Sequence, residues 1–178
     1  MRGRVLIAGS LVGICLTILG AGAPASGALR IDTGADLQAD AEAVDHIEKV
    51  FIRAEKAIEE KDLDALMTVY SEDYRYQDLT KVDMRKIWKG FFEQYDRIST
   101  IHTFSRIMVT PGNPPTADIT CTGGLWAAPD GTDQLVNLSI WAGDIHHLIV
   151  EHGAWKVLGQ GRNAPNRPEF GQAPPPLF

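Results

Sequence analysis

The hydrophobic period of the sequence is mainly helical up to Ile98 and strand-like after it, and this change limits the folds that the chain can adopt. Before Ile98, apart from one short segment at 74–78, apolar residues recur every three or four positions, as on the buried face of an amphipathic helix. After Ile98, runs rich in Thr, Ile and Val alternate with turn-forming residues, as in strands joined by hairpins. We therefore expect an α+β domain, with helices packed on one face of a mostly antiparallel sheet.

Three segments carry the helical pattern. The first begins at Ala41, and its apolar stripe consists of Val44, Ile47, Phe51, Ala54 and Ile58. Asp62 is the expected N-cap of a short second helix. A third helix is expected after residues 80–83, where Thr and Asp form a capping-box pattern. The broad apolar face of that helix contains Met84, Ile87, Trp88, Phe91, Phe92 and Tyr95.

Five segments carry the strand pattern. They are residues 74–78, 100–110, 116–128, 134–150 and 155–158. The first segment alternates with period two, which places Tyr74, Tyr76 and Asp78 on one face of the strand. Turn signals separate the last four segments, so the connections between them are expected to be hairpins.

The first residues have the pattern of a secretory signal peptide: a basic start, an apolar run and small residues that end at Ala28. Cleavage near Ala28 would give a secreted or periplasmic protein with no stable membrane insertion. The competing interpretation is a membrane anchor, but the run is short and Gly-rich for a span. The predicted organisation is a signal peptide (1–28), a flexible segment (29–40), a folded domain (41–161) and a Pro-rich disordered tail (162–178).

The composition argues against several classes of function. The formal charge is −6 and no basic run occurs, so nucleic acid is not an expected partner. Only Cys15 and Cys121 are present, and Cys15 would leave with the signal peptide, so the mature chain could form no internal disulfide. His146 and His147 point to opposite faces of a strand, and no zinc spacing is present, so we predict no metal and no cofactor.

Two stretches, together with the order of the elements, resemble the nuclear transport factor 2-like superfamily, which includes SnoaL-like proteins and ketosteroid isomerase. The first is residues 57–66 (AIEEKDLDAL) followed by 70–73 (YSED), and the second is 151–157 (EHGAWKV). The resemblance covers roughly residues 40–160. It implies a cone in which a strongly curved sheet wraps three helices and leaves a pocket, and it implies a possible homodimer through the outer face of the sheet.

The resemblance also implies a candidate general base. In ketosteroid isomerase-like sequences a carboxylate lies a few residues after the second helix, and counting on from Asp62 places Asp78 at that position. The same pattern has a Tyr on the first helix and a protonated acid on a late strand. The matching positions here are Ala54 and Ile145, which cannot donate a hydrogen bond from the side chain. Ketosteroid isomerisation by that mechanism is therefore not expected.

Asp78 and His147 are the predicted catalytic residues. Asp78 shares a face with two tyrosines, and His147 shares the strand register of Ile145 and Ile149, a face that the family pattern turns inward. An inward carboxylate beside an inward imidazole suits acid–base chemistry. Each also has a plain alternative. Asp78 is then a solvated strand end or a helix cap, and His147 is a core residue or is turned outward by a bulge at Gly143.

Aromatic side chains are the predicted lining of the ligand site. They are Tyr74, Tyr76, Trp88, Phe92 and Trp141. The alternative for the tryptophans and Phe92 is an ordinary place in the core. The leading hypothesis is an apolar pocket for a small hydrophobic organic molecule, with cofactor-free proton transfer of the isomerase or dehydratase type. The alternative is a non-enzymatic module that binds a small ligand or a protein, and the sequence leaves open whether the protein is an enzyme.

Overall fold

The computed structural model describes residues 29–162. The predicted signal peptide (1–28) and all but the first residue of the predicted tail (162–178) lie outside this range. The elements, in chain order, are β1 (Arg30–Gln38), α1 (Ala41–Glu59), α2 (Leu63–Met67), β2 (Tyr70–Tyr76), β3 (Leu79–Thr80), α3 (Lys81–Gln94), β4 (Tyr95–Thr110), β5 (Thr116–Pro129), β6 (Val136–Glu151) and β7 (Ala154–Arg162).

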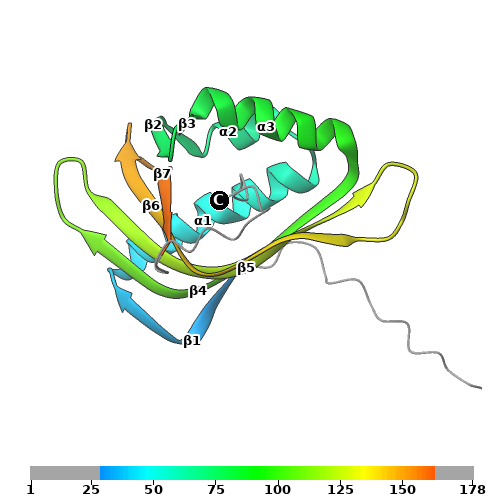
Figure 1. The fold of residues 1–178 in the computed structure, drawn as a ribbon. Helices are drawn as coiled ribbons and strands as arrows, with labels where there is room; N and C mark the ends of the chain where they lie inside the picture. Colours follow the sequence, from blue (N-terminus) through cyan, green and yellow to red (C-terminus); the bar gives the residue numbers. More distant parts are fainter. Residues whose placement is uncertain (1–28, 163–178) are drawn as a thin grey trace, which may run out of the picture.

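All seven strands form one curved sheet in the order β1-β4-β5-β6-β7-β2-β3. Its strand pairs are antiparallel except β1 with β4 and β2 with β7. Figure 1 shows that the sheet bends strongly and that α1 and α3 lie on its concave side. The predicted α+β cone with a mostly antiparallel sheet is confirmed. The three helices are interleaved with β2 and β3, and α2 has only 5 residues.

Residues 29–40 are not the flexible segment that the sequence predicts, because β1 pairs in parallel with the edge of the sheet at β4. The segment has the polar composition of a loop, and most side chains of β1 are exposed. Its backbone still forms a ladder with β4, and Asp36 pairs with Arg106 at 3.3 Å. A polar edge strand of this kind carries no apolar alternation that a sequence pattern could detect.

The predicted helix starts are confirmed. The Asp62 side chain accepts a hydrogen bond from the Ala65 backbone N–H at the start of α2. At the start of α3, Thr80 and Asp83 form the reciprocal bonds of a capping box. The N-cap of α1 is Asp40, whose carboxylate accepts from the Ala43 N–H. These caps satisfy backbone donors that a helix leaves without partners and so fix where each helix begins.

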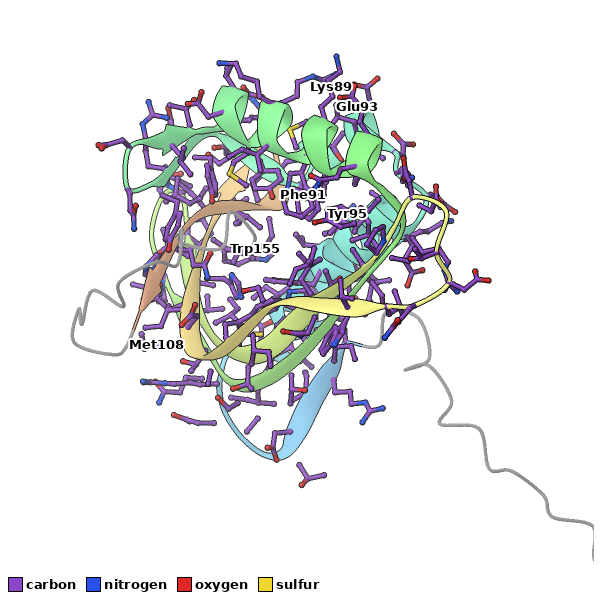
Figure 2. All side chains as sticks on the ribbon, turned by 45° about the vertical axis from the view of Figure 1, so that its right-hand side comes forward. Lys89, Phe91, Glu93, Tyr95, Met108 and Trp155 are labelled. Atoms are coloured by element: carbon purple, nitrogen blue, oxygen red, sulfur yellow. The ribbon has the colours of Figure 1, made fainter. Side chains whose placement is uncertain are left out.

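The core lies between the concave face of the sheet and the helices α1 and α3. Its largest fully buried side chains are Trp88, Tyr70, Tyr74, Phe51, Phe104, Ile47, Ile58, Leu66, Met84, Ile107 and Ile119. Phe91 of α3 and Tyr95, the first residue of β4, lie on the side of α3 that faces the sheet, whereas Lys89 and Glu93 of α3 point away from it (Figure 2). Among residues 29–162, no helix has the length and apolar character needed to cross a membrane.

Candidate functional site

A bulge in β6 decides which of its side chains enter the interior. Cys121 of β5 pairs with Asp144, but Thr122 pairs with Ala142, so Gly143 has no partner in the ladder. Gly143 has φ +72°, a conformation that glycine adopts without steric cost. The extra residue reverses the alternation that follows it. The buried positions are Asp144, His146 and Leu148, so the predicted inward face of Ile145, His147 and Ile149 is wrong.

The structure does not place the predicted pair Asp78 and His147 together in the interior. Strand β2 ends at Tyr76, the chain turns through Gln77 at φ 53°, and Asp78 is exposed in the turn before β3. His147 lies on the outer face of the sheet, where its Nδ1 is 2.7 Å from Asp118 Oδ1. The bulge at Gly143 is the physical reason for its outward position. The outward alternative for His147 is therefore the one that the structure has.

The predicted ligand-lining aromatics all lie in or against the core. Tyr74 meets Tyr70 edge to face at 5.0 Å between ring centroids, and burial raises the pKa of Tyr74 above its ordinary value. Tyr76 is also buried. Trp88 is fully buried, and its ring lies 5.7 Å from that of the half-buried Phe92. Their role toward a ligand stays a prediction, and so does that of Trp141.

A buried carboxylate–imidazole pair crosses the interior from helix to sheet. Glu55 of α1 and His102 of β4 approach to 2.7 Å between Oε1 and Nδ1, and their side chains are 4% and 0% exposed. Glu55 follows Phe51 by one helical turn, which turns it toward the sheet with the apolar stripe. A carboxylate at Nδ1 fixes the orientation of the ring and makes Nε2 the atom that would exchange a proton with a ligand.

Aromatic rings surround this pair. The ring of Phe51 lies 5.5 Å from that of His102 and 5.3 Å from that of His146. His102 lies 5.3 Å from Trp141 and 6.1 Å from His146, again between ring centroids. The Trp141 indole N–H points to the Cys121 sulfur at 3.5 Å. Glu55 and both imidazoles therefore lie among apolar walls, where electrostatic interactions are stronger than in water.

His146 is fully buried and uncharged near neutral pH. Burial is the main cause that holds its pKa well below the ordinary value, and the neighbouring His102 and His147 act in the same direction. Neither ring nitrogen has a hydrogen-bond partner among the described residues. A neutral imidazole carries one donor and one acceptor. A buried imidazole with neither nitrogen hydrogen-bonded costs free energy. His146 is therefore a candidate site residue beside Glu55 and His102.

Two further groups complete the polar interior. The Gln160 side-chain amide donates to Asp144 Oδ2 at 3.1 Å across β6 and β7. Burial raises the pKa of the Cys121 thiol to about 11, and the charges of Asp144 and Glu55 contribute to the same shift. The thiol is therefore protonated at neutral pH and is a poor nucleophile. Within residues 29–162, no cluster of three or more His, Cys, Asp or Glu side chains has an arrangement that could hold a metal ion.

The lowered pKa of His146 predicts a pH-dependent stability. Unfolding returns this imidazole to a pKa near 6.5, so the unfolded chain binds the extra proton first as the pH falls. The stabilisation is therefore complete above about pH 6.5 and is lost below it, by at most about 1.4 kcal/mol per pH unit. Urea unfolding of His146→Gln between pH 7.5 and 5 should show a shallower loss than the native protein. The exposed His46→Gln is the matched control, and equal slopes for all three proteins would contradict the prediction.

Known structures share this arrangement of helices and sheet. A Novosphingobium aromaticivorans protein, named as a candidate scytalone dehydratase, superposes with TM-score 0.51 at 12% identity, over 75% of this chain and 96% of that one. A candidate dehydratase of the nuclear transport factor 2-like family from Streptomyces avermitilis gives TM-score 0.50 at 12% identity, over 68% and 96%. The chain has the nuclear transport factor 2-like fold. No protein-family model and no curated protein sequence matches it significantly.

Other solved structures that match this chain carry different names. A Novosphingobium aromaticivorans protein, named as a candidate aromatic ring hydroxylase, gives TM-score 0.54 at 17% identity, over 72% of this chain and 94% of that one. This chain also spans 42% of a longer protein from Bdellovibrio bacteriovorus, with TM-score 0.49 and 10% identity. At such identities the likeness concerns the fold alone, and the chemistry must be argued from the side chains.

The sequence patterns did not single out Glu55, His102 and His146 as candidate site residues. Glu55 gives one signal that could have found it, because it is an acid within the apolar stripe, one turn after Phe51. His102 lies on the buried face of an alternating strand, where a histidine has no special pattern of its own. His146 is hidden by the bulge, which no alternation rule can place without the structure.

Proposed function

We propose that the protein catalyses cofactor-free proton transfer on a small, largely apolar organic molecule, with chemistry of the isomerase or dehydratase type. The observation that carries the proposal is the 2.7 Å contact between Glu55 and His102, both buried among aromatic rings on the concave side of the sheet. The names of two neighbours with the same fold, both candidate dehydratases, support this class of chemistry. Acid–base catalysis needs a base that is held in one orientation, and the Glu55 carboxylate holds the His102 imidazole in this way.

The proposed step begins at His102. Its imidazole takes a proton from a carbon next to a carbonyl group, and Glu55 stabilises the imidazolium that forms. In an isomerisation, the imidazolium returns the proton to another carbon of the same molecule. In a dehydration, it gives the proton to the departing hydroxyl oxygen, so that a C–O bond breaks, water leaves and a C=C bond forms. Each route returns His102 to its neutral form and balances without a cofactor.

The experiment uses 2-tetralone, a small apolar ketone with acidic C–H groups next to its carbonyl. In D2O, proton abstraction exchanges these hydrogens for deuterium, and NMR measures the rate. The native protein is expected to accelerate the exchange. Glu55→Gln keeps the shape of the side chain but loses its charge, and we expect a loss of roughly 10²-fold, the scale of a positioned acid–base group. His102→Gln should lose at least as much.

The outer pair of Asp118 and His147 supplies a matched control. It has the same 2.7 Å contact, but its side chains are 44% and 42% exposed and lie on the opposite face of the sheet. Asp118→Asn should keep the native exchange rate. Full exchange by Glu55→Gln and His102→Gln, both folded by circular dichroism, would remove the proposal. If Asp78→Asn and His147→Asn lost the activity instead, the residues predicted from sequence would be the catalytic ones.

A second candidate is a module that binds a small ligand without transforming it. The observation that favours it is the position of Ala54, which leaves α1 without a Tyr hydroxyl that could stabilise an enolate. Such a module would bind 2-tetralone, as seen by ligand-observed NMR, and would leave its rate of deuterium exchange at the solvent value. The same sample therefore separates the two functions.

A further inference from the structure

Three polar side chains lie together on the inner face of β6 and β7, and we call Asp144, His146 and Gln160 the β6–β7 polar set. His146 and Gln160 are directly paired across the two strands, so their side chains leave the same face of the sheet. Gln160 Nε2 donates to Asp144 Oδ2 at 3.1 Å. The set adjoins the buried pair, because the ring of His146 lies 6.1 Å from that of His102.

The carboxylate of Asp144 fixes which way the Gln160 amide faces. A carboxylate accepts hydrogen bonds, so the NH2 group must face it, and the opposite orientation would place two oxygens in contact. Oε1 is thereby held as an acceptor. It is buried and has no hydrogen-bond partner among the described residues. The set therefore presents a fixed acceptor to which no described side chain donates.

His146 gives an independent observation of the same kind. Its side chain is fully buried, its lowered pKa keeps it neutral, and neither ring nitrogen has a partner in the described part of the chain. Buried polar groups in native proteins are almost always paired with protein, water or a ligand. Two adjacent residues with such atoms, beside a buried His–Glu pair, indicate a place where another molecule completes the hydrogen bonds.

We propose that the β6–β7 polar set binds the hydroxyl or N–H group of a small organic ligand. The donor hydrogen of that group goes to Gln160 Oε1, and the neutral His146 makes a second bond to the same group. This deepens the proposed function, since it uses the same interior and places the ligand beside His102. It predicts that molecules with a hydrogen-bond donor bind more tightly than ethers and hydrocarbons of the same shape, and it makes Gln160 the residue that distinguishes them.

The test compares p-cresol with 4-methylanisole, which differ in that a methyl ether replaces the hydroxyl donor. Dissociation constants come from ligand-observed NMR titrations of the native protein and two variants. The native protein is expected to bind p-cresol about five- to tenfold more tightly, the value of one net hydrogen bond. Gln160→Met, which keeps the length of the side chain, should abolish this preference. Gln94→Met, at an exposed position at the end of α3, should retain it.

Several results would overturn the inference. They are equal binding of the two probes by the native protein, no binding of p-cresol up to its solubility limit, and an unchanged preference in folded Gln160→Met. The first two need no variant, so the inference can fail even if Gln160→Met does not fold. The measurement detects binding without turnover. If the native protein prefers p-cresol but does not accelerate deuterium exchange, the proposed catalysis alone is removed. If it accelerates exchange but does not prefer p-cresol, the polar-set inference alone is removed.

Discussion

Replacing Gly123 with alanine is expected to destabilise the protein by at least about 3 kcal/mol, the upper range for overpacking a core. A Cβ at this position of β5 would lie 2.1 Å from the Ile101 carbonyl oxygen and 2.6 Å from the Trp141 ring. The carbonyl belongs to the neighbouring strand β4, so it cannot move without disturbing the β4–β5 ladder. Urea unfolding followed by circular dichroism would measure the change, and insoluble expression would be its extreme form.

Gly90→Ala is the matched control for this substitution. Gly90 is exposed within α3, and a Cβ there would meet nothing within 4 Å. Alanine is a better helix former than glycine, so the variant should gain roughly 0.5–1 kcal/mol. A Gly123→Ala protein within about 1 kcal/mol of the native stability would contradict the packing described for β5. It would mean that Ile101 or Trp141 can give way.

The predictable part of the fold is the part specified by local chemistry. Asp62 and the Thr80–Asp83 capping box mark helix starts because they satisfy backbone donors, and the structure confirms both. The long strands follow from alternation between turn signals. By contrast, β1 has mostly exposed side chains and derives its order from pairing with β4. No local pattern reports such an edge, because its stability comes from a distant segment.

The candidate site is less predictable than the fold, because one residue, Gly143, decides which side chains of β6 face the interior. Without the bulge at Gly143, Ile145 and His147 would face the interior. With it, Asp144 and His146 do, so an acid and a different imidazole stand on the interior face of β6 where the sequence pattern expects Ile145 and His147. Register errors of one residue exchange the two faces of a strand completely. The site residues therefore depend on a backbone detail, whereas the fold does not.

Pairing across the interior is the other feature that lies beyond sequence patterns. Glu55 and His102 are 47 positions apart and meet only because α1 crosses the concave face at β4. A buried ionisable pair of this kind needs each partner, since loss of one leaves a polar group without compensation. The exposed Asp118 and His147 have equal geometry but contribute little to stability, because solvent screens their interaction.

Trp88→Ala is expected to cost about 3–5 kcal/mol, as for other large aromatic residues removed from a core. Trp88 is fully buried on α3, and its Nε1 donates to the Tyr70 hydroxyl at 2.9 Å. Its removal leaves a cavity under α3 and takes a donor from Tyr70, whose pKa burial raises well above its ordinary value. Urea unfolding would measure the loss. Trp126→Ala, at a half-buried position on β5, should cost clearly less.

The sequence leaves open whether Trp88 serves the core or a ligand. Shortening a side chain that lines a ligand site weakens ligand binding. It changes the free energy of unfolding of the empty protein only slightly. Trp88→Phe separates the effects, because it keeps most of the apolar volume and removes the hydrogen bond to Tyr70. We expect it to cost about 1–3 kcal/mol, the scale of a lost buried hydrogen bond, with 2-tetralone exchange retained in the folded protein. Native stability with weakened exchange would instead place Trp88 against the ligand.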